Sequence, residues 1–363
     1  MSRMPDALSE SRLVEIRREA ENKGLVQGAG VAPAAAPFPR ASEQTGYYGM
    51  PLLKQPQWKW EVPIYLFVGG LAGAAGVIAP FAEWVGNDYK LARDARWLAL
   101  GGVTLSTGLL VADLGRPERF LNMLRVFKPQ SPMSVGSWVL TAFGTMAGAS
   151  AFAKAVQARW DWLPVRVIGN LAQAGVGALG LPLHNYTGVL VGATVVPVWN
   201  CNIKTLPLHF GASGVQAGCS ALELMGHFDS PALNWLAMMA NAYETFEGIH
   251  LETRLDRELL PLKQGRSGWI TRAGGVLSGP VPLGLRMLAA LSLGKRARNA
   301  RKWAAVAGLA GSLLTRYGWI AAGRESARNW KLPLEIPDAV TETPQPKSEL
   351  VPEEFRQERE ALG

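Results

Sequence analysis

The chain has 363 residues, of which 48% are hydrophobic and 18% are charged, and its formal net charge is +8. Charged residues are nearly absent from several runs of about 20 residues, which is the length of helix that crosses ~30 Å of hydrocarbon. Lysine and arginine instead gather in short loops between these runs, as they do at membrane surfaces. The composition therefore indicates an all-α integral membrane protein and excludes a nucleic-acid partner.

The two cysteines, Cys201 and Cys219, limit the redox groups that the protein can hold. An iron–sulfur cluster takes about four cysteine ligands, and covalently attached haem takes a Cys-x-x-Cys-His motif. Two isolated cysteines supply neither, so we expect no bound haem or iron–sulfur cluster in this chain. Electron carriers are expected in other subunits.

The chain divides into a membrane domain between two tails. Residues 1–60 are predicted to form a soluble tail and linker, because Gly28–Pro39 is rich in alanine, proline and glycine. A transmembrane helical domain is expected over residues 61–323. The C-terminal tail, residues 324–363, is acidic and contains proline, and we expect it to be disordered.

About eight transmembrane helices are expected, packed as a bundle. The first has a face of small residues that includes Gly69 and Gly73, which lets a neighbouring helix approach closely. The fourth run contains Pro182, and we interpret it as one long, kinked helix rather than two. The seventh follows a basic loop, residues 254–272, and is interrupted by Arg286. The expected helices cover residues 62–84, 96–112, 135–156, 165–199, 205–226, 231–252, 274–294 and 304–322.

The densest polar stretch follows the second helix and begins Asp113-Leu114-Gly115-Arg116-Pro117. Gly115 can bend the backbone, and Pro117 can begin a new short helix. The stretch therefore places a carboxylate and a guanidinium at the membrane surface, as a lip that could hold a ligand. The alternative is a local turn with its own ion pair, since Asp, Gly and Pro are ordinary after a helix.

Polar residues also occur inside the fourth helix. Pro182 cannot donate a hydrogen bond to the carbonyl of Ala178, which leaves a free acceptor near His184 and Tyr186. A buried tyrosine hydroxyl needs a hydrogen-bond partner. His184 is either part of a ligand site or a packing histidine bonded to a backbone carbonyl.

A polar stripe runs along the fifth predicted helix. His209, Gln216 and Glu223 are spaced by seven residues and therefore stay on one face. Glu244 and neighbouring polar residues of the sixth helix face a similar direction. Polar groups inside a membrane are costly, so this stripe is a candidate proton path, with interhelical hydrogen bonding as the alternative.

Three motifs occur in a fixed order along the sequence. They are Asp113–Phe120, then Ser131-Pro132-Met133-Ser134, then Tyr186-Thr187-Gly188 before Pro197-Val198-Trp199. Together they resemble the NrfD/PsrC family, the polysulfide reductase-type membrane subunits that handle quinol in molybdopterin oxidoreductase complexes. The resemblance runs from about Tyr47 to Arg328.

The resemblance implies eight transmembrane helices and no cofactor held by this chain, with menaquinone or ubiquinone as an exchangeable substrate. It also implies a multi-pass protein of the bacterial inner (plasma) membrane. The implied partners are a ferredoxin-like iron–sulfur subunit and, through it, a molybdopterin oxidoreductase.

The same resemblance implies a quinol-binding pocket at the interface with the iron–sulfur subunit. It assigns this pocket to Asp113, Gly115, Arg116 and Tyr186. Some relatives add polar side chains in the first helix, whereas residues 67–71 here are Phe-Val-Gly-Gly-Leu. His184 or Tyr65 could take that place.

These observations predict a membrane subunit of a respiratory oxidoreductase that is not catalytic on its own, and that could also move protons. Two other functions stay open. One is a haem b anchor, in which His209 and His250 are axial ligands at similar depth. The other is an ion transporter built on the broken fourth helix, although no inverted repeat is visible.

Overall fold

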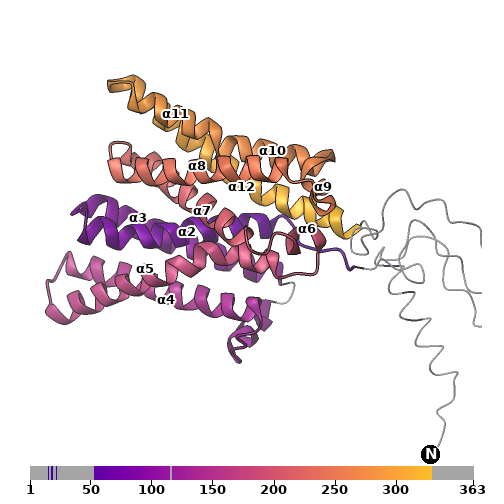
Figure 1. Cartoon of the computed structure of the whole chain (residues 1–363). Helices are drawn as coiled ribbons and strands as arrows, with labels where there is room; N and C mark the ends of the chain where they lie inside the picture. Colours follow the sequence, from indigo (N-terminus) through magenta and orange to yellow (C-terminus); the bar gives the residue numbers. More distant parts are fainter. Residues whose placement is uncertain (1–14, 16–17, 19–21, 23–52, 115–116, 329–363) are drawn as a thin grey trace, which may run out of the picture.

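The computed structural model describes residues 53–114 and 117–328, together with Glu15, Arg18 and Asn22. Every regular element in this part is helical (Figure 1). Gly115, Arg116 and most of both expected tails lie outside the described residues. The expected all-α fold is confirmed for the part of the protein that the structure describes.

Four long helices form the first half of the bundle. They are α2 (Glu61–Trp84), α3 (Tyr89–Asp113), α4 (Pro132–Gln157) and α5 (Leu163–Gly192). α2 packs against both α3 and α5. The predicted small-residue face permits this, since a Cβ at Gly73 would lie 2.8 Å from the backbone nitrogen of His184. Below, the end of the bundle where α3 stops is called the Asp113 end, and the opposite end is called the Glu83 end.

Two helices of this half begin earlier than predicted, because capping side chains start them. Asp88 accepts a hydrogen bond from the backbone of Leu91 at 2.9 Å, so α3 begins at Tyr89 rather than at Arg96. Ser131 caps α4 through the backbone nitrogen of Ser134 at 3.4 Å. The second sequence motif is therefore a helix cap.

The fourth predicted helix is a single helix, α5, with Pro182 inside it, as expected. It ends at Gly192, however, and not near Trp199. Pro197 starts a separate short helix, α6 (Pro197–Asn200), because proline fits the first helical position. Trp199 is fully buried, stacks on Trp58 with ring centroids 5.0 Å apart, and donates a 2.8 Å hydrogen bond to the carbonyl of Trp319.

The second half contains more breaks than the sequence indicated. Its elements are α7 (Leu206–Leu222), the π-helix η3 (Glu223–His227), α8 (Pro231–Thr253), η4 (Arg257–Leu259), α9 (Leu260–Lys263), α10 (Gly265–Ser278), α11 (Pro280–Ala290) and α12 (Gly294–Arg328). The expected basic loop is mostly helical. α12 continues to Arg328, so the helix includes the first five residues of the expected C-terminal tail.

α10 and α11 lie end to end in Figure 1 and together replace the expected seventh helix. The break falls at Gly279, where a Cβ would lie 2.9 Å from the backbone nitrogen of Thr245 in α8. Pro280 then starts α11. The close approach of α8 and the proline together account for the interruption.

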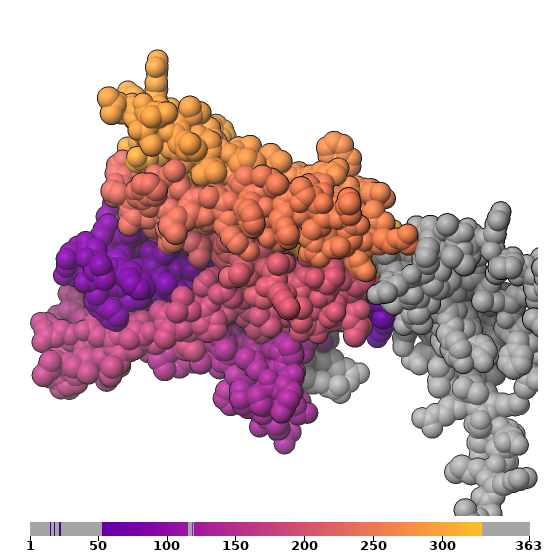
Figure 2. All heavy atoms as spheres, viewed as in Figure 1, coloured from indigo at the N-terminus to yellow at the C-terminus, as the bar shows by residue number. Residues whose placement is uncertain are grey.

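Large apolar side chains are exposed along the long helices. α2, α3 and α4 are long and apolar enough to cross a membrane, by length and composition. Figure 2 shows the later helices, in orange, stacked on the earlier ones, in indigo to magenta. Exposed examples from successive helices are Phe81, Leu105, Phe152, Leu171, Leu208, Trp235, Met287 and Trp303. An apolar exterior of this kind suits a lipid environment.

Candidate functional site

Two buried tyrosines meet near the Asp113 end of the bundle. Tyr65 comes from the second turn of α2 and Tyr186 from the last third of α5. The two phenols lie within electrostatic reach of each other. Tyr65 is 6% exposed and Tyr186 is 8% exposed, yet neither hydroxyl bonds to any described residue. Two phenol hydroxyls are thus available to a ligand.

Gly136 of α4 fixes the position of the Tyr186 ring. A Cβ at Gly136 would lie 1.7 Å from Cζ of Tyr186 and 2.0 Å from its hydroxyl oxygen. No side chain fits in that space, so the ring lies directly against the α4 backbone. The missing side chain of Gly136 therefore forms the seat of the Tyr186 phenol.

Two carboxylates lie at the same end. Glu61 is in the first turn of α2, and Asp113 is the last residue of α3. Asp113 is within electrostatic reach of Glu61 and of Lys59. Oε2 of Glu61 is buried and has no partner among the described residues. We call Glu61, Tyr65, Asp113 and Tyr186 the tyrosine cluster.

The lip after α3 has the form that the sequence predicted where it is described. Pro117 begins a 3-10 helix, η2 (Pro117–Leu124). Ser134 of α4 accepts a 3.0 Å hydrogen bond from the backbone of Lys128 and donates to the carbonyl of Val126. These bonds hold the end of the lip to α4. The predicted ligand residues Gly115 and Arg116 lie outside the described residues.

His184 points away from Tyr186. Its Nδ1 lies 2.8 Å from the carbonyl of Gly180, and its Nε2 lies 3.3 Å from the amide nitrogen of Asn185. Its ring faces α7, where a Cβ at Gly211 would come within 3.3 Å of it, whereas Tyr186 faces α4. This is the packing arrangement that the sequence left open as the alternative. Tyr65, not His184, stands beside Tyr186.

The second group of polar residues lies between α7, α8, α10 and α12. Nδ1 of His209 is 3.1 Å from Oε1 of Glu244, but the ring N–H and the carboxylate are not aligned for a hydrogen bond. The other carboxylate oxygen of Glu244 accepts a 2.9 Å hydrogen bond from Ser278. The structure thus brings together two of the four predicted proton-path residues.

Arg316 of α12 adds a buried positive charge to this group. It is fully buried, donates to the carbonyl of Phe210 at 2.7 Å and also donates to the hydroxyl of Ser213. Its guanidinium lies 4.4 Å from the centroid of the Phe210 ring, and its charge faces Glu244. The sequence analysis overlooked Arg316, although an arginine inside an apolar helix was a sufficient signal.

Glu223 has a fixed partner that the stripe did not predict. Both of its carboxylate oxygens accept hydrogen bonds from Arg286, at 2.5 and 2.7 Å, and both residues are fully buried. Arg286 also donates to Asn234 at 3.2 Å. The interruption of the seventh run is therefore the counter-charge of Glu223. The pair lies near the Glu83 end, where His227 contacts Asp94 at 2.8 Å.

Between these charged groups lie buried polar atoms without partners. Neither amide atom of Gln216 and not the hydroxyl of Ser220 bonds to a described residue. Gln216 lies against Gly308 of α12, where a Cβ would be 1.6 Å from its amide nitrogen. Unpaired buried polar groups are rare, and ordered water is their usual partner. We call His209, Glu244, Arg316, Gln216, Ser220, Glu223 and Arg286 the polar band.

The first half of the bundle holds a polar cluster of a different kind. At the Glu83 end, Glu83 accepts hydrogen bonds from Arg96 at 2.6 Å, Lys154 at 2.5 Å and Gln173 at 2.7 Å. Arg96 donates further to Gln173. None of these side chains has an unpartnered buried atom. The cluster joins four helices and needs no further ligand.

The structure gives the two histidines of the haem alternative different surroundings. His209 lies 5.9 Å from Trp319 between ring centroids, whereas His250 stacks on Phe246 at 6.1 Å. Among the described residues, no group of three or more His, Cys, Asp or Glu side chains is placed to bind a metal ion.

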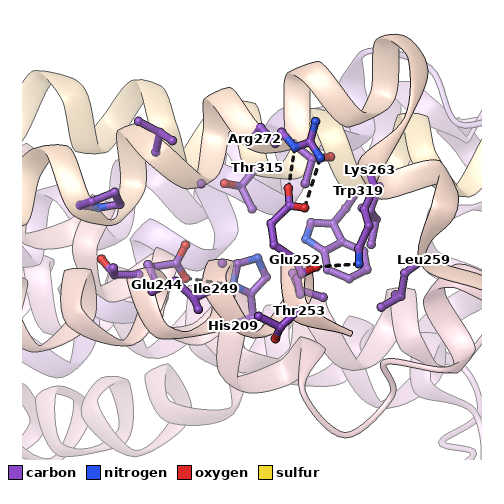
Figure 3. Close-up of a pocket in the computed structure, with 18 residues that line it drawn as sticks. His209, Glu244, Ile249, Glu252, Thr253, Leu259, Lys263, Arg272, Thr315 and Trp319 are labelled. Carbon is purple, nitrogen blue, oxygen red and sulfur yellow. Dashed lines mark hydrogen bonds and ion pairs between the residues drawn. The ribbon is translucent and has the colours of Figure 1, made fainter. Parts of the chain in front are cut away.

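A cavity of about 500 Å³ opens beside the polar band. Figure 3 shows its walls, with His209 and Glu244 among the lining residues and Glu252 directed toward Arg272. Its other walls come from α8, α9, α10 and α12, and they are mostly apolar. Its size is within the range of small-molecule sites.

Comparison with known proteins connects these features to a family. Residues 52–228 match the family described as "Polysulphide reductase, NrfD", a segment that runs from before α2 to the end of η3. The protein is also similar to the C subunit of the polysulfide reductase of Wolinella succinogenes, with 29% identity over 197 residues, which are 47% of this sequence and 58% of that subunit. The match thus spans less than two thirds of the relative. The three motifs that suggested the family all lie inside the matched segment. Over residues 52–228, this helical membrane protein belongs to the NrfD polysulphide reductase family.

Proposed function

We propose that the protein is the quinone-reactive membrane subunit of a multi-subunit oxidoreductase. In this role it binds quinol or quinone at the tyrosine cluster and exchanges electrons with a partner iron–sulfur subunit. The name of the relative, which is one lettered subunit of a polysulfide reductase, supports assembly with other subunits. The partners are a ferredoxin-like iron–sulfur protein and, through it, a molybdopterin enzyme. Menaquinone or ubiquinone is the exchangeable substrate.

The tyrosine cluster meets the chemical needs of such a site. Oxidation of a quinol to a quinone releases two electrons and two protons. The site therefore needs hydrogen-bond partners for the ring oxygens and acceptors for the protons. The hydroxyls of Tyr65 and Tyr186 supply the first, and the carboxylates of Glu61 and Asp113 supply the second. Both electrons leave to the partner subunit. The juxtaposed, unpartnered phenols are the observation on which the proposal rests.

The helices account for eight membrane crossings in the bacterial plasma membrane. We assign these crossings to α2, α3, α4, α5, α7 with η3, α8, α10 with α11, and α12. The broken pair counts as one crossing because α10 and α11 lie end to end. Arg286 and Arg316 lower the hydropathy of the last two crossings, but both face the interior. Buried charges of this kind are expected at functional positions in membrane proteins.

The polar band is the proposed route for protons through the second half. His209 and Glu244 lie toward the Asp113 end, and the Glu223–Arg286 pair lies toward the Glu83 end. Successive stripe residues on α7 are seven apart, or about 10 Å at the helical rise. The unpartnered Gln216 and Ser220 between them suit a hydrated connection. Glu244, which has no arginine bonded to it, is the better candidate for a titrating group than Glu223.

The test of this function is Tyr186→Phe, which removes one hydroxyl and keeps the ring. Loss of one ligand hydrogen bond of roughly 1 to 1.5 kcal/mol lowers quinol affinity about tenfold. The measurement is titration of the purified protein with a quinol analogue, together with quinol-dependent turnover of the assembled complex. Tyr89→Phe is the matched control, because Tyr89 is 68% exposed at the Glu83 end. Equal affinity in wild type and Tyr186→Phe would place the quinol elsewhere.

A further inference from the structure

The cavity beside the polar band has an apolar body and one polar inner wall. Leu251, Leu259, Leu262 and Val276 contribute to the apolar lining. Three threonines also line it, but Thr245, Thr271 and Thr315 each donate their hydroxyl to a carbonyl of their own helix, at 2.8 to 2.9 Å. These hydroxyls therefore have no hydrogen left for a ligand.

The polar inner wall is made by His209 and Glu244. His209 is 5% exposed and lines the cavity, and neither of its ring nitrogens makes an aligned hydrogen bond to a described residue. Oε1 of Glu244 is also without a hydrogen-bond partner there. Trp319 lines the same space and gives it an aromatic wall. The inner wall thus offers an unpartnered imidazole next to a flat apolar surface.

The rim of the cavity carries charges that are already paired. Arg272 donates to both oxygens of Glu252, at 2.5 and 3.1 Å. Lys263 donates to the backbone carbonyls of Glu252, at 3.0 Å, and of Arg254. A phospholipid would need a free positive charge at this rim for its phosphate. A fatty acid with its head at the inner wall would meet the carboxylate of Glu244.

These features select a neutral amphiphile with a hydrogen-bonding ring. We propose that the cavity binds a second quinone or quinol, with one ring oxygen at His209, the ring beside Trp319 and the isoprenoid tail toward the rim. A lipid tail alone would leave the buried imidazole without a partner, which is unfavourable. The site is separate from the tyrosine cluster, so the proposal does not depend on the role of Tyr186.

Two glycines provide a way to close the cavity without disturbing the fold. Gly275 of α10 and Gly248 of α8 both line it, and a Cβ at either position meets no atom within 4 Å. Leucine at either position therefore projects into the cavity without a backbone clash. Gly284 of α11 is equally open but does not line the cavity, so Gly284→Leu is the matched control.

The experiment measures how many molecules of ubiquinone-1, a quinone with one isoprenoid unit, bind to the purified full-length protein in lipid nanodiscs. Wild type and Gly284→Leu are expected to bind two equivalents at saturation. Gly275→Leu and Gly248→Leu are expected to bind one. Tyr186→Phe in the same assay weakens only the other site, so failure of one site is distinguishable from failure of the other.

Three results would overturn the proposal. Unchanged stoichiometry in both leucine variants shows that ubiquinone-1 does not occupy the cavity. Loss of quinol-linked proton uptake with unchanged stoichiometry shows that the cavity is a water-filled entrance to the polar band. Native mass spectrometry that detects a phospholipid lost from the leucine variants, and not displaced by ubiquinone-1 in wild type, assigns the space to lipid.

Discussion

At the scale of single residues, the position of one hydroxyl depends on a glycine fifty residues away. Tyr186 could be found from its motif, but its orientation is set by the empty space at Gly136. Because the α5 helix turns His184 toward α7 and Tyr186 toward α4, residues close in sequence serve different neighbours. The tyrosine cluster is therefore a product of helix rotation as much as of composition.

Gly136→Ala should disturb the tyrosine cluster. The added methyl group would overlap the phenol and force the ring to move, and overpacking of this kind costs about 1 to 3 kcal/mol. Quinol-analogue affinity is expected to fall at least as far as in Tyr186→Phe, and thermal stability should fall as well. Gly148→Ala on the same helix is the control, since a Cβ there meets nothing within 4 Å. If both alanine variants bind the analogue like wild type, the Tyr186 phenol is not part of the pocket.

At the scale of helices, paired and unpaired polar groups distinguish structural from functional contacts. The cluster around Glu83 is fully hydrogen-bonded and joins α2, α3, α4 and α5. The polar band joins α7, α8, α10, α11 and α12 but leaves several buried atoms without partners among the described residues. Since an unsatisfied buried group is costly, such groups persist where they serve water or a ligand.

Glu223→Gln should destabilise the bundle, because it removes one half of a fully buried ion pair. The change leaves the Arg286 guanidinium uncompensated, and breaking such a pair costs roughly 3 to 5 kcal/mol. The double variant Glu223→Leu with Arg286→Met removes both charges and is expected to recover most of the loss. Thermal unfolding in detergent measures both effects. A single variant as stable as wild type would mean that the pair is not formed in the protein.

At the scale of the whole molecule, the division into two halves separates the proposed tasks. The family match covers α2 to η3, which contains the whole tyrosine cluster. α8 to α12 supply Glu244, Arg286, Arg316 and most of the cavity. Electron transfer at the Asp113 end and proton movement through the second half would meet at α7, which packs against α2, α5, α8 and α12.

The purified protein, freed of its partners, should show no haem α band and no iron. The expectation rests on two isolated cysteines and on His209 and His250 having different neighbours. A reduced-minus-oxidised absorption spectrum with metal analysis measures it. The same preparation with its partner subunits attached provides the positive control for iron. One b-type haem per protein molecule would favour the anchor function instead.

The sequence by itself determined which segments are helical and which family they match. Apolar runs of membrane-spanning length, the start of a short helix at Pro117 and the single helix through Pro182 are local properties of the sequence, so they could be predicted from it. The basic loop and the seventh run were predicted less well, because the break at Gly279 depends on its contact with Thr245, far away in sequence.

Only the tertiary structure decided which side chains meet. The 3.6-residue period predicts the face of a helix on which a residue lies, but not the helix that the face will touch. Tyr65 with Tyr186, Glu223 with Arg286, and Arg316 opposite Glu244 are pairs from separate helices. Their meeting depends on the rotation of each helix and on close approach at glycines such as Gly70 and Gly214. The site therefore follows from packing, whereas the helices follow from local sequence.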